Sequence, residues 1–181
     1  MLVIGGSAGS LEVLLQLLPK LKDHLSFAIV IVLHRKNSSD SGLVELLAGR
    51  TKIPVSEVED KETILPDHIY LAPGDYHLLF ERNKTFSLDF SEKVNYSRPS
   101  IDVAFETAAD GYGENVTCLL LSGANADGSA GINYAKKAGG QVAVQDPETA
   151  SSPQMPSIAL QNTKVDLVLN VEQMITFINS L

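Results

Sequence analysis

The chain has 181 residues, 44% of them hydrophobic and 20% charged, and a formal net charge of −8. This composition is typical of one globular domain with a sizeable core, and it excludes a disordered chain. The acidic balance argues against general nucleic-acid binding, which requires a basic face.

The length of the apolar runs and the number of cysteines limit the expected location of the protein and the role of its cysteine. The longest apolar runs, such as Phe27–Leu33, are too short to span a bilayer, and no signal-peptide pattern occurs. We therefore expect a cytoplasmic protein without membrane insertion. The single cysteine, Cys118, lies in the apolar segment NVTCLLLS, which favours a buried structural side chain over a catalytic thiol or a zinc ligand.

Strand and helix patterns alternate in the first part of the chain. The predicted elements are a strand at Leu2–Ile4, a helix at Leu11–Leu18, a fully buried strand at Phe27–Leu33 and a short helix at Ser41–Gly49. Between about residues 55 and 90, short alternating segments (HIYLA, HLLFE and FSLDF) are separated by turn residues. We interpret this region as a small antiparallel hairpin extension of the sheet.

The alternation resumes in the second half of the chain. The predicted elements there are helix Pro99–Ala109, strand Val116–Leu121, helix Gly128–Ala138, strand Val142–Gln145, strand Val165–Leu169 and helix Val171–Leu181. Repeated strand–helix units predict an α/β fold with a doubly wound, mostly parallel sheet and helices on both faces.

The glycine-rich turn at Gly5–Gly9, between the first strand and the first helix, fits two kinds of site. One is a phosphate cradle, in which backbone N–H groups at a helix N-terminus bind an anion. The other is a nucleophile elbow, because GGSAG matches G-x-S-x-G letter for letter. The glycine spacing and acidic residue of a dinucleotide site are missing, as is the lysine of a P-loop. The turn by itself favours neither site strongly.

Three polar side chains that follow predicted strands decide between these sites. Ser7 follows the first strand, His34 follows FAIVIVL, and Asp127 lies in LSGANADGSAG after another buried strand. Residues just past the carboxyl ends of parallel strands meet at one edge of the sheet, where ligands bind. We therefore predict a catalytic site in which His34 takes the proton of Ser7 and Asp127 orients the imidazole.

Such a site also needs N–H donors for the oxyanion that forms on attack. The backbone N–H of Ala8 is the natural first donor, and the turn near Ala124 can supply a second. Each triad candidate has a structural alternative as well: Ser7 as a helix cap, His34 as a loop residue and Asp127 as the cap of the next helix. Their joint occurrence at three strand ends favours catalysis.

Seven short motifs follow one another from about Leu2 to the C-terminus. They are VIGGSAGSLEVL, VLHR, IYLAPGDYHLLF, SRPSIDVAFETAA, LLSGANADGSAGINYAKKAGG, VAVQDPETA and MPSIAL. Together they resemble the catalytic domain of the chemotaxis protein-glutamate methylesterase family, CheB. The resemblance implies a metal-free and cofactor-free serine hydrolase with its triad on Ser7, His34 and Asp127. Such enzymes remove methyl groups from glutamate methyl esters on chemoreceptor helices, releasing methanol, and many also deamidate receptor glutamines.

Two further residues are candidates for substrate contact. His77, in APGDYHLL, is an alternative site histidine because a folded-back hairpin can overhang the sheet edge. Arg98 precedes the helix expected from Pro99 and can reach an acidic receptor surface or the substrate backbone. An ordinary surface arginine is its alternative interpretation.

The sequence departs from the family pattern at three places. Ala8 stands where threonine is frequent, Gly123-Ala124-Asn125-Ala126 where Gly-Met-Gly-Asn is usual, and Ser97 where a histidine is usual. These residues are expected to line the site, so they bear on substrate choice and rate. They motivate two alternatives: a catalytically weak binding or adaptor module in signalling, and an esterase or amidase with a different substrate.

We expect residues 1–181 to form one CheB-type catalytic domain. The regulatory receiver domain that usually precedes it in the family is absent from this chain. The chain is then either an excised domain, with a receiver domain as partner in a longer parent chain, or a member of a stand-alone or differently fused subfamily.

Overall fold

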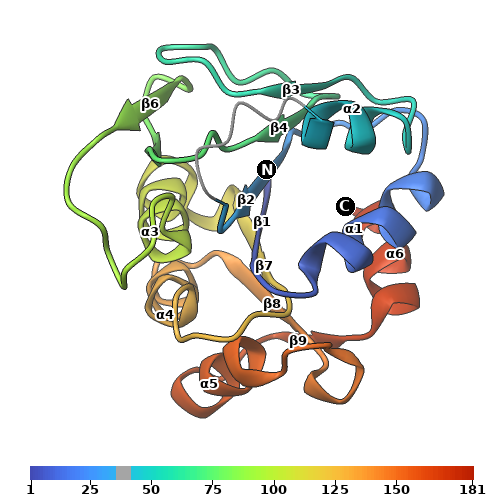
Figure 1. The fold of residues 1–181 in the computed structure, drawn as a ribbon, viewed down its shortest axis with the longest axis vertical. Helices are drawn as coiled ribbons and strands as arrows, with labels where there is room; N and C mark the ends of the chain where they lie inside the picture. Colours follow the sequence, from blue (N-terminus) through green and yellow to red (C-terminus); the bar gives the residue numbers. More distant parts are fainter. Residues whose placement is uncertain (36–41) are drawn as a thin grey trace.

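The computed structural model describes residues 1–35 and 42–181. Its centre is a seven-stranded sheet of order β3-β4-β2-β1-β7-β8-β9, in which every neighbouring pair is parallel (Figure 1). The strands are β1 Leu2–Gly6, β2 Ile29–Leu33, β3 Val55–Glu57, β4 Ile69–Leu71, β7 Thr117–Leu120, β8 Gln141–Gln145 and β9 Leu167–Leu169. The predicted doubly wound, parallel α/β architecture is confirmed.

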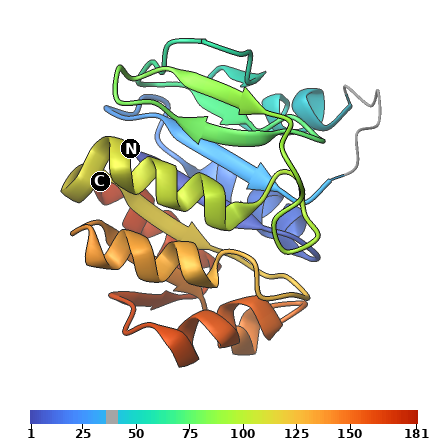
Figure 2. The same cartoon turned by 90° about the vertical axis from the view of Figure 1, so that its left-hand side faces the viewer.

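Helices cover both faces of this sheet. They are α1 Ser10–Leu17, α2 Gly42–Ala48, α3 Ile101–Tyr112, α4 Ser129–Lys137, α5 Gln154–Asn162 and α6 Val171–Ser180. Helices α3, α4 and α5 pack on one face, and α1, α2 and α6 pack on the other (Figures 1 and 2).

The alternation of side chains along the strands builds a core on each face. In β1, Val3 joins the core under α3, α4 and α5, whereas Leu2 and Ile4 join the core under α1, α2 and α6. Strand β2 repeats this alternation. Because both faces are covered, the central strands read as continuous apolar runs, which is why FAIVIVL predicts a buried strand correctly.

The three segments between residues 55 and 90 do not all belong to the predicted hairpin. HLLFE and FSLDF do pair antiparallel, as β5 (His77–Phe80) and β6 (Phe86–Asp89), in a separate two-stranded sheet. HIYLA instead supplies β4, which lies inside the parallel sheet between β2 and β3. The interpretation of HIYLA as hairpin material was therefore wrong. Three buried residues carry too short a pattern to distinguish a central strand from a hairpin arm.

The helix expectations differ from the structure at two places, and a third lies partly outside the described residues. Helix α5 was not predicted, although its sequence contains a proline, Pro156, at a position that a helix tolerates. Pro156 lies in the first turn of α5, where backbone N–H groups have no intrahelical partner. The helix expected from Pro99 begins at Ile101, with Ser100 as its N-cap. The short helix expected from Ser41 begins at Gly42, and Ser41 itself lies outside the described residues.

The strand order contains a topological switch point at β1. Strand β1 has β2 on one side and β7 on the other, so the chain reverses its direction of progress across the sheet at β1. Doubly wound sheets bind ligands outside the carboxyl ends of the strands at this switch. The loops after β1, β2 and β7 are therefore where a site is expected.

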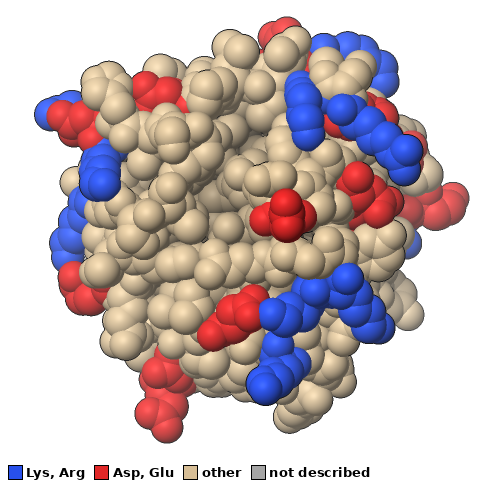
Figure 3. All heavy atoms as spheres, turned by 180° about the vertical axis from the view of Figure 1, so that it is seen from behind, with Lys and Arg blue, Asp and Glu red and all other residues tan. Residues whose placement is uncertain are grey.

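The surface carries charges of both signs. On the face opposite to that of Figure 1, Lys and Arg side chains alternate with Asp and Glu side chains around a broad uncharged area (Figure 3). Although the net charge of the chain is −8, this face is therefore not uniformly acidic. Within residues 1–35 and 42–181, no helix combines the length and apolar character needed to cross a membrane.

Candidate active site

Ser7 lies in the sharp turn between β1 and α1. Gly9 has a φ of +83° in this turn, and a Cβ added to it would lie only 2.7 Å from Cβ of Ser151. The Ser7 N–H lies 2.9 Å from both Ser122 C=O and Ser10 Oγ. The N-cap of α1 is Gly9, without a capping side chain. The Ser7 hydroxyl therefore does not cap α1, which removes its structural alternative.

Two buried serines, Ser10 and Ser122, hold this turn against the rest of the sheet. Ser10 Oγ donates to Ser122 C=O (2.6 Å), and Ser122 Oγ donates to Ala8 C=O (2.7 Å). The backbone N–H of Ser122 donates to Gln145 Oε1 at 2.9 Å. The ends of β1, β7 and β8 are thereby tied together. Sequence reasoning missed both serines, although a serine directly after the buried run LLL was a usable signal for Ser122.

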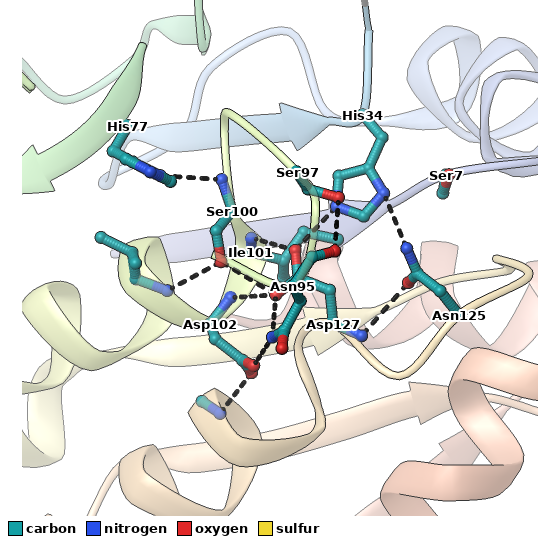
Figure 4. A network of polar contacts seen from close by, with 12 residues as sticks. Ser7, His34, His77, Asn95, Ser97, Ser100, Ile101, Asp102, Asn125 and Asp127 are labelled. Atoms are coloured by element: carbon teal, nitrogen blue, oxygen red, sulfur yellow. Dashed lines mark hydrogen bonds and ion pairs between the residues drawn. The ribbon is translucent and has the colours of Figure 1, made fainter. Parts of the chain in front are cut away.

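His34 follows β2 directly, beside the turn that carries Ser7. Its backbone N–H donates to Gly6 C=O at 3.2 Å, so the two strand ends adjoin. Its ring Nε2 lies 2.7 Å from Asp127 Oδ2 (Figure 4). A carboxylate only accepts hydrogen bonds, so Nε2 carries the hydrogen and Nδ1 carries the lone pair. No hydrogen bond joins Ser7 Oγ to His34 among the contacts of the described residues.

Asp127 is fully buried and lies at the N-terminus of α3; it does not cap α4, whose N-cap is Gly128. Its Oδ2 accepts the N–H of Ile101 (2.7 Å), and its Oδ1 accepts the N–H of Asp102 (3.1 Å) and the hydroxyl of Ser100 (2.9 Å). Burial opposes ionisation, but these bonds and the one from the His34 ring outweigh it and lower the pKa of Asp127. The side chain is thus held as an anion.

A second carboxylate, Asp102, is buried beside Asp127. Its Oδ1 accepts the N–H of Gly131 at 2.7 Å. Asn95 Nδ2 donates to Asp102 Oδ2 (2.8 Å) and lies 3.3 Å from Asp127 Oδ1. Burial, with a contribution from the charge of Asp127, raises the pKa of Asp102 to about 6. Asp102 falls near the start of the helix expected from Pro99, but sequence analysis did not anticipate this carboxylate pair.

The loop after β7 adds a second polar contact to the His34 ring, besides that with Asp127. Asn125 Nδ2 lies 3.5 Å from His34 Nδ1, and Asn125 Oδ1 accepts the N–H of Asp127 at 3.1 Å. Ala8 and Ala124, the two expected oxyanion donors, are both exposed. Neither of their N–H groups donates to another of the described residues.

His77 does not reach this edge as a free side chain. It is only 1% exposed, its Nδ1 accepts the N–H of Ser100 (3.2 Å), and its Nε2 lies 3.0 Å from Glu92 C=O. Both ring nitrogens are thus engaged inside the protein. The structure thus buries His77 against the start of α3 and does not present it as a free side chain at this edge, and its contact with substrate stays a prediction.

Arg98 is held from several sides. Its Nη2 donates to Asp75 Oδ1 (2.7 Å), its Nη1 donates to the carbonyls of Phe90 (3.0 Å) and Ser91 (2.7 Å), and its guanidinium stacks 3.9 Å over the Phe90 ring. These contacts give Arg98 a structural role in the loop between β6 and α3. It nevertheless lines the same cleft as His34.

The cleft has a volume of about 470 Å³ and includes His34 in its lining. Its lining residues are His34, Arg35, Asp75, Lys93, Tyr96, Ser97 and Arg98. Tyr96 is 98% exposed at the rim, so a large partner can reach it. No group of three or more His, Cys, Asp or Glu side chains in the described parts of the chain is arranged to hold a metal ion.

The fold and this geometry define a doubly wound α/β domain with serine, histidine and aspartate side chains at the carboxyl edge of its sheet. The sequence profile of the CheB methylesterase family matches residues 2–178. The chain therefore belongs to the CheB methylesterase family.

Individual relatives agree with this assignment. A Leptospira interrogans protein with the activities protein-glutamate methylesterase and protein-glutamine glutaminase in its name is 44% identical over 172 residues, covering 95% of this chain and 89% of the relative. The protein-glutamate methylesterase/protein-glutamine glutaminase of Chromohalobacter salexigens is 35% identical over 162 residues, covering 88% of this chain and 46% of the relative.

A solved structure shows the same fold. The catalytic domain of the Thermotoga maritima CheB methylesterase superposes with a TM-score of 0.94 at 31% sequence identity, covering 99% of this chain and 96% of that domain. The chain spans about half the length of the curated Thermotoga maritima protein that it matches, which is 33% identical over 170 residues.

Proposed function

We propose that this protein is a serine hydrolase that removes methyl groups from glutamate methyl esters of chemoreceptors. Methanol is the product, and receptor glutamines are deamidated by the same route with ammonia as the leaving group. The observation that carries the proposal is the bond between His34 Nε2 and the buried carboxylate of Asp127, with Ser7 at the adjoining strand end. Family membership and the names of the relatives support the substrate class.

In the first half of the reaction, Ser7 Oγ attacks the ester carbonyl carbon and its proton passes to His34 Nδ1. Asp127 stabilises the resulting imidazolium through Nε2. The negative charge moves to the carbonyl oxygen, for which the backbone N–H groups of Ala8 and Ala124 are the proposed donors. The bond between carbon and methoxy oxygen then breaks, and Nδ1 returns the proton to the leaving group, giving methanol.

In the second half, a water molecule attacks the acyl-enzyme. His34 Nδ1 takes a proton from this water as general base. The bond to Ser7 Oγ then breaks, Nδ1 returns the proton to Oγ, and the product is a free glutamate side chain. The chemistry needs no group beyond these side chains, the backbone donors and water.

The proposed partner is a receptor helix that presents its methylated glutamate to the cleft. The cleft is open and has the exposed Tyr96 on its rim, which suits a macromolecular substrate.

We further propose that residues 1–181 form one catalytic domain. The parallel sheet runs from Leu2 to Leu169, and α6 packs back onto the same core as α1.

Methanol release from a methylated receptor cytoplasmic fragment tests this proposal. The Ser7→Ala variant removes the hydroxyl without enlarging the side chain, and we expect release to fall to background. The variant's thermal unfolding should match that of the native protein, because Ser7 Oγ caps no helix. Release that persists in Ser7→Ala would refute the mechanism, and no release from either protein would favour a binding module or another substrate.

A further inference from the structure

Asn125 contacts both the ring of His34, the proposed base, and the backbone of Asp127, the proposed orienting residue. Sequence analysis marked it only as a departure from the family pattern. Its side chain makes two contacts: Nδ2 lies 3.5 Å from His34 Nδ1, and Oδ1 lies 3.1 Å from the backbone nitrogen of Asp127 (Figure 4). One short side chain thus joins the loop after β2 to the loop after β7.

The direction of these two bonds follows from the groups involved. The Asp127 N–H is a donor, so the Asn125 atom facing it is the amide oxygen, in a turn that spans two residues. The amide NH₂ must then face His34. Because Nε2 of that ring already donates to a carboxylate, Nδ1 presents its lone pair and accepts from Asn125.

The same lone pair is the one that must take the proton of Ser7. We propose that Asn125 is a positioning residue that holds His34 in the tautomer competent for general-base catalysis. An N–H donor favours the unprotonated ring, because a protonated Nδ1 would face another donor. Asn125 must therefore separate from Nδ1 when the proton arrives. The inference rests on the proposed function only in making His34 the base.

Other charges also act on the His34 ring, and an experiment must leave them unchanged. Asp127 lies against Nε2, and the second buried carboxylate, Asp102, lies behind it. The charged side chains lining the cleft in front are Arg35, Asp75, Lys93 and Arg98. Asn125 itself is neutral, so its replacement by another neutral residue changes none of these charges.

Asn125→Ser is the most informative variant. A serine hydroxyl can still accept the N–H two residues ahead, which keeps the turn at Asp127, but it is too short to reach His34. Asn83→Ser is the matched control, because Asn83 Oδ1 also accepts an N–H two residues ahead, from Thr85 in the β5–β6 turn. The readouts are the NMR titration and tautomer of the His34 ring, and the pH dependence of methanol release.

We expect the native ring to show the Nε2–H tautomer. In Asn125→Ser, the midpoints of the ring titration and of the acid limb of the rate profile should both rise by about half a pH unit. This shift is about a threefold change in proton affinity, the size expected for one hydrogen bond. At pH values above the acid limb, the rate should change by less than this factor. Asn83→Ser should match the native protein in both readouts.

The outcomes separate this inference from the proposed function. An unchanged His34 titration in Asn125→Ser, or a rate loss that is equal at every pH, would overturn the positioning role. An absence of methanol release from the native protein would overturn the proposed function instead, while the NMR titration would still report on Asn125.

Discussion

At the scale of single residues, Asp127 illustrates how a buried charge is supported. Its two oxygens accept hydrogen bonds from the start of α3, from Ser100 and from the His34 ring, and these donors outweigh the effect of burial on its pKa. Asp102, which shares the Asn95 amide with Asp127, has fewer donors and a raised pKa. Two neighbouring carboxylates are thus pushed in opposite directions by their surroundings, and the charge is concentrated on the one that contacts His34.

The raised pKa of Asp102 predicts a pH-dependent contribution to stability. The folded protein holds a proton on Asp102 up to about pH 6, whereas the unfolded chain releases it near the ordinary value of 3.8. Asp102 therefore favours folding less as the pH rises from about 4 to above 6. Urea unfolding of the native protein and of Asp102→Asn should show a stability difference that shifts in favour of the variant over this range. Parallel curves would contradict the assignment.

At the scale of elements, the turn between β1 and α1 is a tightly constrained connection of the site. Gly9 combines a positive φ with close contacts, because an added Cβ would lie 2.7 Å from Ser151 Cβ and 2.8 Å from Ser122 Oγ. The turn also places Ser7 above the end of β1. Strain in this turn should therefore affect both stability and activity.

Gly9→Ala tests this constraint. We expect the free energy of unfolding to fall by about 2–4 kcal/mol, from the left-handed backbone and the steric overlap together, and methanol release to fall with it. Gly49→Ala is the control, because its Cβ would meet nothing closer than 3.4 Å; a change within about 0.5 kcal/mol is expected there. Equal effects of the two substitutions in urea unfolding would show that the turn is not specially constrained.

At the scale of the whole molecule, the two cores meet at the central strands. Cys118 lies in β7, which pairs with β1 and β8, and it is fully buried. Burial raises the pKa of its thiol, so the reactive thiolate is suppressed as well as shielded. Exposure of this side chain requires the sheet to open.

Thiol labelling should therefore report global unfolding. We expect Cys118 to remain essentially unlabelled by a thiol-reactive reagent in the native protein and to react fully at urea concentrations that unfold it. The labelling midpoint should coincide with the loss of helical circular dichroism, and Cys118→Ala provides the blank. Rapid labelling without denaturant would show that the centre of the sheet opens locally.

The short-range pattern of the sequence predicted the fold class and the edge of the sheet at which the site residues lie. Period-two and continuous apolar segments predicted the parallel α/β class, because strands covered on both faces need apolar residues throughout. The positions of Ser7, His34 and Asp127 directly after such strands predicted that they would meet, since parallel strands end at one edge. The contact between His34 and Asp127, 93 residues apart, agrees with that argument.

The tertiary structure decided what depends on distant neighbours. The three residues of β4 belong to the sheet because β2 and β3 flank them, and His77 is buried between the start of α3 and the loop after β6. Likewise, nothing in the sequence around Asn95 or Asn125 shows that their amides reach the buried carboxylates and the His34 ring. A local pattern determines which face of an element is apolar, whereas hydrogen-bond partners are set by strand order and by loops that meet across the sheet edge.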